Sequence, residues 1–344
     1  MIEVIREKDT WNELVNSCQY SDSYHTYDYH HATLVEGEEP ILIHYTEKGN
    51  SILLPLLIRD IEFSKYKDAT SVYGYGGPIA SEAFEYFDLK LFQKELRACF
   101  IELNLLTVFL RLNPFIPSQD IFLHQLGAIE TIGNILFIDI KESIDEQIKG
   151  YHRRLRTYVN KFRNIYLVKK ASTPSEIDSF IEAYYQTMNR VNAKKEYFFS
   201  KTYFNELIKS SQFETEILLA ISRKTDEVAG GAMFLKKEGI IQYHLSGTNN
   251  SFLNSNPLKL LIDDMRIKGT QEKYKFFNLG GGVGAKEDSL FYFKSGFSNH
   301  TLPFKVWKYI INQKKYDELV SQRNVIANSK YDSSFFPGYR FKRF

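Results

Sequence analysis

Cysteine is scarce in this sequence, with two residues, Cys18 and Cys99, among 344. Two cysteines cannot build the disulfide framework of a secreted scaffold, and such usage is typical of a reducing compartment. Long apolar runs are lacking too, because the longest, such as Ile52–Ile58, have the length of a strand rather than of a membrane span. The first residues show no basic stretch followed by an apolar one. We therefore expect a cytoplasmic protein, with peripheral contact at the inner face of the membrane as a further option.

A surplus of charge of either sign is also lacking. The chain has 44 Lys and Arg against 42 Asp and Glu, a net charge of +2. The field of the whole protein therefore selects no partner, and any anion must bind at a local cluster. DNA is not expected as a partner. Hydrophobic residues make up 43% and aromatic residues 15%, which is typical of a folded globular chain.

The length of 344 residues exceeds one ordinary core and fits two domains. Predicted strands and helices interleave along the chain, which favours an α/β or α+β fold with mixed sheets flanked by helices. We predict an N-terminal domain over residues 1–145 and a C-terminal domain that carries the cleft over residues 146–312. A C-terminal helix with an aromatic and basic tail is expected over residues 313–344.

The two halves repeat one order of elements. In each half an aromatic strand ends in glycine, a helix follows, and a second strand comes after the helix. The strand pairs are Ser71–Gly77 with Thr107–Leu112, and Gln242–Gly247 with Lys275–Leu279. We interpret this order as an internal duplication of supersecondary structure.

The glycine-rich segment Val228–Phe297 holds most of the candidate chemistry. Gly230 and Gly231 lie inside an apolar strand, where glycine indicates a bulge or a closely passing backbone. Further on, Asn256 is predicted to cap a helix that starts at Pro257. A helix N-terminus at the end of a strand suits a phosphate or carboxylate. The alternative is an ordinary capped helix.

A glycine run follows the strand at Lys275–Leu279. Gly280-Gly281-Gly282 and the nearby Lys286 suggest a phosphate-binding P-loop, but the spacing fails because Ala285 and Glu287 stand where that motif has Gly and Ser or Thr. Nucleotide hydrolysis is therefore not expected. The run could instead let a substrate lie against the backbone, or form a mobile loop.

Lys294 lies among aromatic residues, directly after Phe293. Such a lysine could neutralise a phosphate or a developing oxyanion. A lysine in an aromatic strand could equally extend to solvent. No cysteine, histidine or carboxylate pattern completes a metal site, and no motif indicates a covalent nucleophile.

A basic helix is predicted from about residue 143 to residue 163. Arg153 and Arg154 belong to a run of Lys and Arg that contains no acid. This run could bind RNA, an anionic lipid precursor or a nucleotide-sugar diphosphate. The alternative is a solvated helix face. The tail Phe335–Phe344 mixes aromatics with Arg340, Lys342 and Arg343, and either docks on the body or contacts a membrane surface.

Together these segments resemble the FemABX-like aminoacyltransferases and the neighbouring GNAT-type acyltransferases of cell-envelope biosynthesis. The resemblance covers about residues 150–300, and it rests on the order and spacing of several motifs. They are Arg153-Arg154-Leu155-Arg156, Tyr184–Arg190, Gln242–Thr248, Asn256–Lys259, Phe276–Gly282 and Phe293-Lys294-Ser295-Gly296-Phe297.

The resemblance implies two tandem GNAT-like domains. It implies that Lys294, the lysine of an F-K-x-G-F motif, lies at the substrate phosphates and the transition state, and that Arg190 and Tyr243 line the same cleft. The coenzyme A signature of GNAT proteins is absent, since Asn249–Asn256 stands in its place. The helical hairpin of some family members is absent as well. The donor therefore stays open between aminoacyl-tRNA and acyl-coenzyme A, with no tightly bound cofactor.

We accordingly expect a transferase that moves an acyl or aminoacyl group onto an amine of a cell-wall (peptidoglycan) or surface-polysaccharide precursor. The expected partner is an anionic small molecule or a lipid-linked envelope precursor, with transfer RNA as a further candidate. One alternative is an acetyl-coenzyme A-dependent N-acetyltransferase that acts on a sugar. Another is a non-catalytic binding protein with a degenerate GNAT cleft. The general base, with Asp288, water and a substrate phosphate as candidates, and the oligomeric state are left open.

Overall fold

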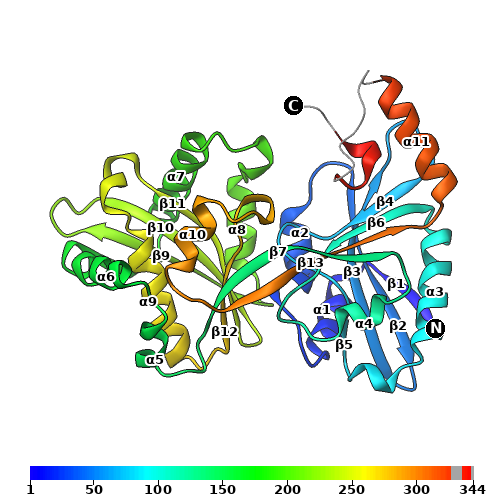
Figure 1. Cartoon of the computed structure of the whole chain (residues 1–344), viewed down its shortest axis with the longest axis horizontal. Helices are drawn as coiled ribbons and strands as arrows, with labels where there is room; N and C mark the ends of the chain where they lie inside the picture. Colours follow the sequence, from blue (N-terminus) through cyan, green and yellow to red (C-terminus); the bar gives the residue numbers. More distant parts are fainter. Residues whose placement is uncertain (327–334, 342–344) are drawn as a thin grey trace. The chain divides into compact units, whose positions relative to one another are not determined.

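Two units make up the computed structural model, which describes residues 1–326 and 335–341 (Figure 1). The first comprises Met1–Ile132 and the described part of Phe304–Phe344, and the second comprises Gly133–Pro303. The expected boundaries after residues 145 and 312 are displaced. The reason is a long-range pairing: the strand at Thr301–Ile310 runs back into the first unit, where it pairs with the strand at Leu105–Arg111.

The first unit has a mixed sheet in the order β1-β2-β3-β4-β6-β13, with β5 beside β3. Its strands are β1 (Ile2–Ile5), β2 (Glu38–Glu47), β3 (Asn50–Asp60), β4 (Lys67–Thr70), β5 (Ile79–Ala80), β6 (Leu105–Arg111) and β13 (Thr301–Ile310). Its helices are α1 (Lys8–Asn16), α2 (Tyr27–Thr33), α3 (Leu89–Glu102), α4 (Gln119–Leu123) and α11 (Gln313–Ile326). β4 and β6 are parallel, and α3 connects them.

The second unit has a mixed sheet in the order β7-β12-β11-β10-β9-β8. Its strands are β7 (Ala128–Asp139), β8 (Tyr166–Lys170), β9 (Glu214–Ser222), β10 (Val228–Lys237), β11 (Ile240–Thr248) and β12 (Phe276–Gly280). Its helices are α5 (Ile144–Lys149), α6 (Arg153–Ile165), α7 (Pro174–Arg190), α8 (Lys201–Lys209), α9 (Leu258–Gln271) and α10 (Ser289–Ser295). β11 and β12 are parallel, and α9 connects them.

Both units therefore share one topology, and the predicted internal duplication is present. In each, four antiparallel strands lead to a parallel pair that is joined through a helix. One strand of the prediction is misplaced, because the first-unit strand is β4 at Lys67–Thr70 rather than Ser71–Gly77. Ser71 still donates to the Phe109 carbonyl, and the chain then turns at Gly74, whose φ of +111° lies outside the extended region.

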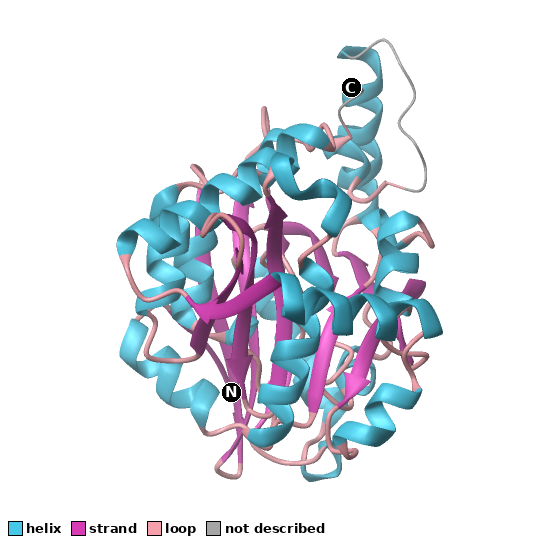
Figure 2. Cartoon of the chain, turned by 90° about the vertical axis from the view of Figure 1, so that its left-hand side faces the viewer, coloured by secondary structure: helices cyan, strands magenta, loops and turns pink. Residues whose placement is uncertain are grey.

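Helices cover both faces of the second sheet (Figure 2). On one face, apolar residues of α6 and α9, such as Leu155 and Leu261, join the core with Phe234 of β10. On the other face α7 packs closely on β10 and β11. A side chain on Gly231 would lie 2.7 Å from Phe180, and one on Gly247 would lie 2.3 Å from the α7 backbone. At Gly230 both predicted features are present, because a side chain there would lie 2.7 Å from the carbonyl oxygen of Gly247 and the register of β10 against β9 shifts between Val228 and Gly230.

The C-terminal tail docks on the first unit where it is described. Tyr339 and Arg340 both donate to the carboxylate of Asp68, which is fully buried. Lys342 and Arg343 lie outside the described residues. Within residues 1–326 and 335–341, no helix combines the length and apolarity that crossing a membrane requires.

Candidate active site

β11 and β12 run together at their beginnings and separate at their ends. Their parallel register covers three positions and ends with Gln242 opposite Asn278, although β11 continues to Thr248. The last contact is between two buried side chains, since Asn278 Nδ2 donates to Gln242 Oε1 at 2.7 Å. Asn278 Oδ1 also accepts from the amide of Gly280, whose φ of +77° turns the chain. We call the separated strand ends, residues 243–248 and 279–282, the β11–β12 fork.

A β-bulge lies on the β11 side of the fork. Tyr243 and Leu245 face consecutive residues of β10, so His244 between them is the inserted residue. Its Nε2 lies 2.5 Å from the hydroxyl of Tyr203 on α8. Burial lowers the pKa of His244 to about 3, so the imidazole is neutral at physiological pH.

Tyr243 points to the opposite face from His244, toward the α9 side. Its ring packs 5.8 Å from that of Phe234, and its hydroxyl donates to Ser246 Oγ at 2.6 Å. Burial raises the pKa of Tyr243 to about 12, so the hydroxyl stays protonated. The structure thus places Tyr243 on the β11 side of the fork, and that it lines a substrate cleft remains a prediction.

Lys294 reaches the other side of the fork. It lies on the helix α10 and not on a strand, because Asp288 caps the helix by accepting from the amide of Phe291 at 3.0 Å. The lysine is 8% exposed and does not extend to solvent. Its ammonium donates to the carbonyl oxygen of Gly281 at 2.7 Å. In the part of the chain that the structure describes, no carboxylate forms an ion pair with it.

This environment perturbs the pKa of Lys294. Burial lowers it from 10.5 to about 8, and the negative charge of Asp288 opposes that shift in part. The ammonium has three donors, of which the Gly281 carbonyl takes one. Lys294 is therefore a buried cation with remaining capacity to donate to a ligand. Phe293, its neighbour, packs edge-on against Phe297 and belongs to the core.

The glycine run packs against its own chain. A side chain on Gly281 would lie 2.9 Å from the carbonyl oxygen of Asn134, and one on Gly282 would lie 2.1 Å from that of Lys286. The structural need for Gly281 and Gly282 is thus the packing of the loop itself. That a substrate lies against this backbone remains a prediction.

Arg190 lies at the end of α7, beside the exit of β11. Its guanidinium donates to Asn250 Oδ1 at 2.6 Å and to Thr187 Oγ1 at 3.0 Å. Thr187 in turn accepts from the amide of Thr248, the last residue of β11. Arg190 therefore fixes the loop that follows the fork.

Asn256 does not cap α9 with its side chain. The structure starts the helix at Leu258 with Pro257 as its N-cap, and no side-chain cap is formed. The amide of Lys259 donates to the carbonyl of Asn256 at 3.4 Å, and that of Leu260 donates to the carbonyl of Pro257 at 3.0 Å. The start of α9 is thus closed largely by backbone groups, and the buried Asn256 Oδ1 has no hydrogen-bond partner among the residues that the structure describes.

The basic segment forms two helices, α5 and α6, instead of the single predicted helix. The break centres on Tyr151, whose buried hydroxyl donates to Asp263 at 2.8 Å and accepts from Arg266 at 2.9 Å. Arg153 and Arg154 are exposed in the first turn of α6. The amide of His152 donates to the carbonyl of Gly296, so the start of α6 lies beside the end of α10.

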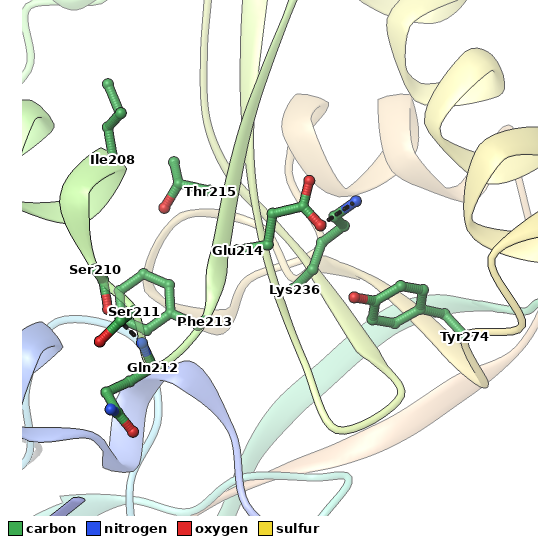
Figure 3. Close-up of a pocket in the computed structure, with 9 residues that line it drawn as sticks. All are labelled: Ile208, Ser210, Ser211, Gln212, Phe213, Glu214, Thr215, Lys236 and Tyr274. Carbon is green, nitrogen blue, oxygen red and sulfur yellow. Dashed lines mark hydrogen bonds and ion pairs between the residues drawn. The ribbon is translucent and has the colours of Figure 1, made fainter.

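A cavity of about 440 Å³ lies elsewhere in the second unit, toward the beginnings of β11 and β12 (Figure 3). Lys236 and Glu214 line it and form an ion pair of 2.9 Å, and the ring of Tyr274 lies beneath Lys236. Lys236 also pairs with Glu216 and Glu272. Its cation is thus neutralised by three carboxylates, unlike that of Lys294, and for this reason we place the candidate site at the fork.

Sequence reasoning missed His244, Tyr203 and Asn278 as parts of this site. Asn278 had a signal, because an amide between Phe277 and Leu279 is a polar residue in an apolar strand. His244 had none, since a bulge depends on the register of two strands. Within the described residues, no group of three or more His, Cys, Asp or Glu is placed to hold a metal ion.

The sequence matches no family model, and it matches no curated protein. The structure, however, defines a fold class: two α/β units in tandem that share one topology, each a mixed sheet flanked by helices, as expected from the sequence. The crystal structure of FemX matches with a TM-score of 0.70 at 13% identity, over 92% of this chain and 99% of that one. The chain thus has a FemX-like fold, and the fold that the resemblance implied is confirmed.

Two further structures match over most of their length. The C-terminal domain of a protein assigned as a lysylphosphatidylglycerol synthetase from Agrobacterium fabrum has a TM-score of 0.56 at 12% identity, covering 93% of this chain and 97% of that domain. A conserved protein of unknown function from Bacteroides thetaiotaomicron has a TM-score of 0.57 at 10% identity, covering 90% and 100%. At these identities the likeness concerns the fold.

Proposed function

We propose that the chain transfers an acyl or aminoacyl group to an amine at the β11–β12 fork. The observation that carries the proposal is Lys294, a buried ammonium that donates to the Gly281 carbonyl and retains further donors. Amine acylation needs a polarised carbonyl, a deprotonated amine and an aligned pair of reactants. Lys294 meets the first need, because a buried cation strongly stabilises the charge that develops on oxygen.

The proposed transfer needs no covalent enzyme intermediate. The amine nitrogen attacks the acyl carbon, a carbon–nitrogen bond forms, and the bond to the donor's leaving oxygen or sulfur breaks. The amine proton ends on the leaving group. Asp288 is poorly suited as the base, because the amides of Val283 and Phe291 occupy its oxygens and help to lower its pKa. A substrate phosphate or water is the better candidate.

The start of α9 supports an aminoacyl ester as the donor over acyl-coenzyme A. A pyrophosphate at a helix N-terminus needs free amides. Here Pro257 has none, and the amides of Lys259 and Leu260 already donate to backbone carbonyls, which leaves the amide of Leu258 for such a ligand. The exposed Arg153 and Arg154 offer the phosphates of a transfer RNA or of an anionic precursor another place to bind.

For the acceptor we propose an amine-bearing cell-wall or surface-polysaccharide precursor, including a lipid-linked one. Two points support this choice. One is the resemblance to envelope aminoacyltransferases, and the other is the similar fold of a domain assigned to lysylphosphatidylglycerol synthesis. Such an acceptor would bring the protein to the inner face of the membrane.

The test is a transfer assay with three labelled donors: an aminoacyl-tRNA pool, acetyl-coenzyme A, and free amino acid as the control. Each is mixed with an amine-bearing peptidoglycan precursor or an amino sugar nucleotide. We expect transfer from aminoacyl-tRNA, and loss of transfer in Lys294→Met. Transfer from acetyl-coenzyme A alone would establish the acetyltransferase instead. Precursor binding without transfer from any donor would establish a binding protein.

A further inference from the structure

A side-chain contact between His244 and Tyr203 ties the bulge in β11 to the neighbouring helix α8. His244 is the inserted residue, and its Nε2 lies 2.5 Å from the Tyr203 hydroxyl. Tyr203 is itself fixed, since it is 3% exposed and its ring stacks on Phe199 at 4.3 Å. A bulge turns the side chain of its inserted residue, and here it turns His244 toward α8.

The position of this bulge matters because the hydrogen-bonded pairing of β11 with β12 ends at the same place. Pairing with β12 ends at Gln242, two residues before His244. The conformation of residues 243–246 thus depends on β10 and on contacts with the helices. The Tyr203 contact lies within that short stretch, on the face opposite to the Tyr243 ring.

We propose that Tyr203 and His244 are a positioning pair, which holds the bulge so that the backbone of residues 243–246 keeps its place against the acyl group at the fork. Neither side chain acts on the substrate in this account. The inference rests on the proposed transferase function for its kinetic consequence, and its structural part stands independently of that function.

The neutral state of His244 fits a positioning role. Either ring nitrogen can hold the proton of a neutral imidazole, so Nε2 either accepts from the Tyr203 hydroxyl or donates to its oxygen. Glutamine can do both through its side-chain amide. His244→Gln should therefore keep the contact, whereas His244→Leu and Tyr203→Phe should break it with little change in volume.

The experiment compares these variants in the transfer assay and by amide NMR. We expect Tyr203→Phe and His244→Leu to lower kcat about tenfold with KM within about twofold, since a small misplacement at a reacting centre acts on the chemical step. His244→Gln should retain most of the activity. The double variant Tyr203→Phe/His244→Leu should lose no more than either single variant, because the two share one contact.

The matched control is Tyr29→Phe, which removes a hydroxyl donor to the Tyr73 carbonyl (2.7 Å) in the first unit. It should leave kcat and the amide resonances of residues 243–246 unchanged, while Tyr203→Phe shifts those resonances. Wild-type kcat in Tyr203→Phe would overturn the inference, as would His244→Gln being as slow as His244→Leu. Should the wild type transfer nothing, the proposed function fails, and unchanged resonances in Tyr203→Phe would then still overturn the positioning role.

Discussion

At the residue scale, the buried charge of Lys294 lowers the stability of the fold, although the proposed function needs it. Its burial without a carboxylate partner lowers its pKa from 10.5 to about 8, which corresponds to roughly 3 kcal/mol at neutral pH. The folded state holds fewer protons than the unfolded chain between these two values, so this penalty is fully present below pH 8 and fades as the pH rises toward 10.5. A protein without use for this cation would be more stable with an apolar residue there.

We therefore predict that Lys294→Met raises the free energy of unfolding at pH 7 by about 1–2 kcal/mol while it abolishes transfer. The gain stays below the full penalty because the Gly281 carbonyl loses its donor. Urea unfolding at pH 7 and pH 10 measures it, and the gain should shrink at pH 10. The control Lys161→Met, at an exposed position of α6, should change neither quantity. A less stable Lys294→Met protein would contradict the assigned environment.

The sequence pointed to Lys294 but not to its surroundings. The amino-acid sequence shows the aromatic motif around Lys294, but the motif by itself predicts a strand. Only the Asp288 cap and the packing of Phe291 make the segment a helix with the lysine on its buried face. Arg190 and Tyr243 came from the resemblance; the structure places Tyr243 in the fork and Arg190 beside the loop that follows it.

At the scale of elements, the two parallel strand pairs differ. The pair β4 and β6 of the first unit stays closed, whereas the pair β11 and β12 of the second unit opens, and the candidate site lies at the open pair. In the first unit the pair stays closed beyond β4, because the amide of Ser71 donates to the Phe109 carbonyl and that of Gly76 to the Arg111 carbonyl. Gln119 then bonds to the Gly76 carbonyl and fills the adjacent space. In the second unit the pair opens after Gln242. The duplicated fold thus provides one fork.

The contact between α7 and β11 gives a prediction at this scale. A methyl group on Gly247 would lie 2.3 Å from the backbone of α7, and a helix backbone cannot move aside cheaply. Gly247→Ala should destabilise the protein by at least about 2 kcal/mol and impair transfer, as urea unfolding and the assay would measure. Gly150→Ala, whose nearest neighbour is 3.3 Å away at a helical φ, should cost less than about 1 kcal/mol. Equal effects of the two changes would contradict the packing.

The buried contact between Asp68 and the C-terminal segment gives a further prediction at the scale of elements. Asp68 is fully buried and bonds to Arg59, Tyr339 and Arg340. Removing Arg340 leaves a buried carboxylate with less compensation, so Arg340→Ala should destabilise the first unit by about 2–4 kcal/mol in urea unfolding. The double variant Asp68→Asn/Arg340→Ala should lose less free energy of unfolding than the sum of the two single variants, because the two residues form one pair. Additive losses would mean that the tail docks by its aromatic residues alone.

At the scale of the whole molecule, the sequence predicted the duplication and the α/β class but not the division of the chain. Periodicity and order of elements are local properties, and they predicted most of β11, α9 and β12. The boundaries depend on β13, which leaves the second unit to pair with β6 some 200 residues earlier. No local pattern records such a pairing. The comparisons show a FemX-like fold, and the fork with Lys294 is where we propose that transfer takes place.

The most direct test of that location is a crystal structure of the chain with a non-hydrolysable amide analogue of an aminoacyl-RNA 3′ end. We expect the acyl carbonyl at the β11–β12 fork, within hydrogen-bond reach of Lys294 Nζ. An analogue bound in the cavity beside Lys236, or anywhere away from the fork, would contradict it.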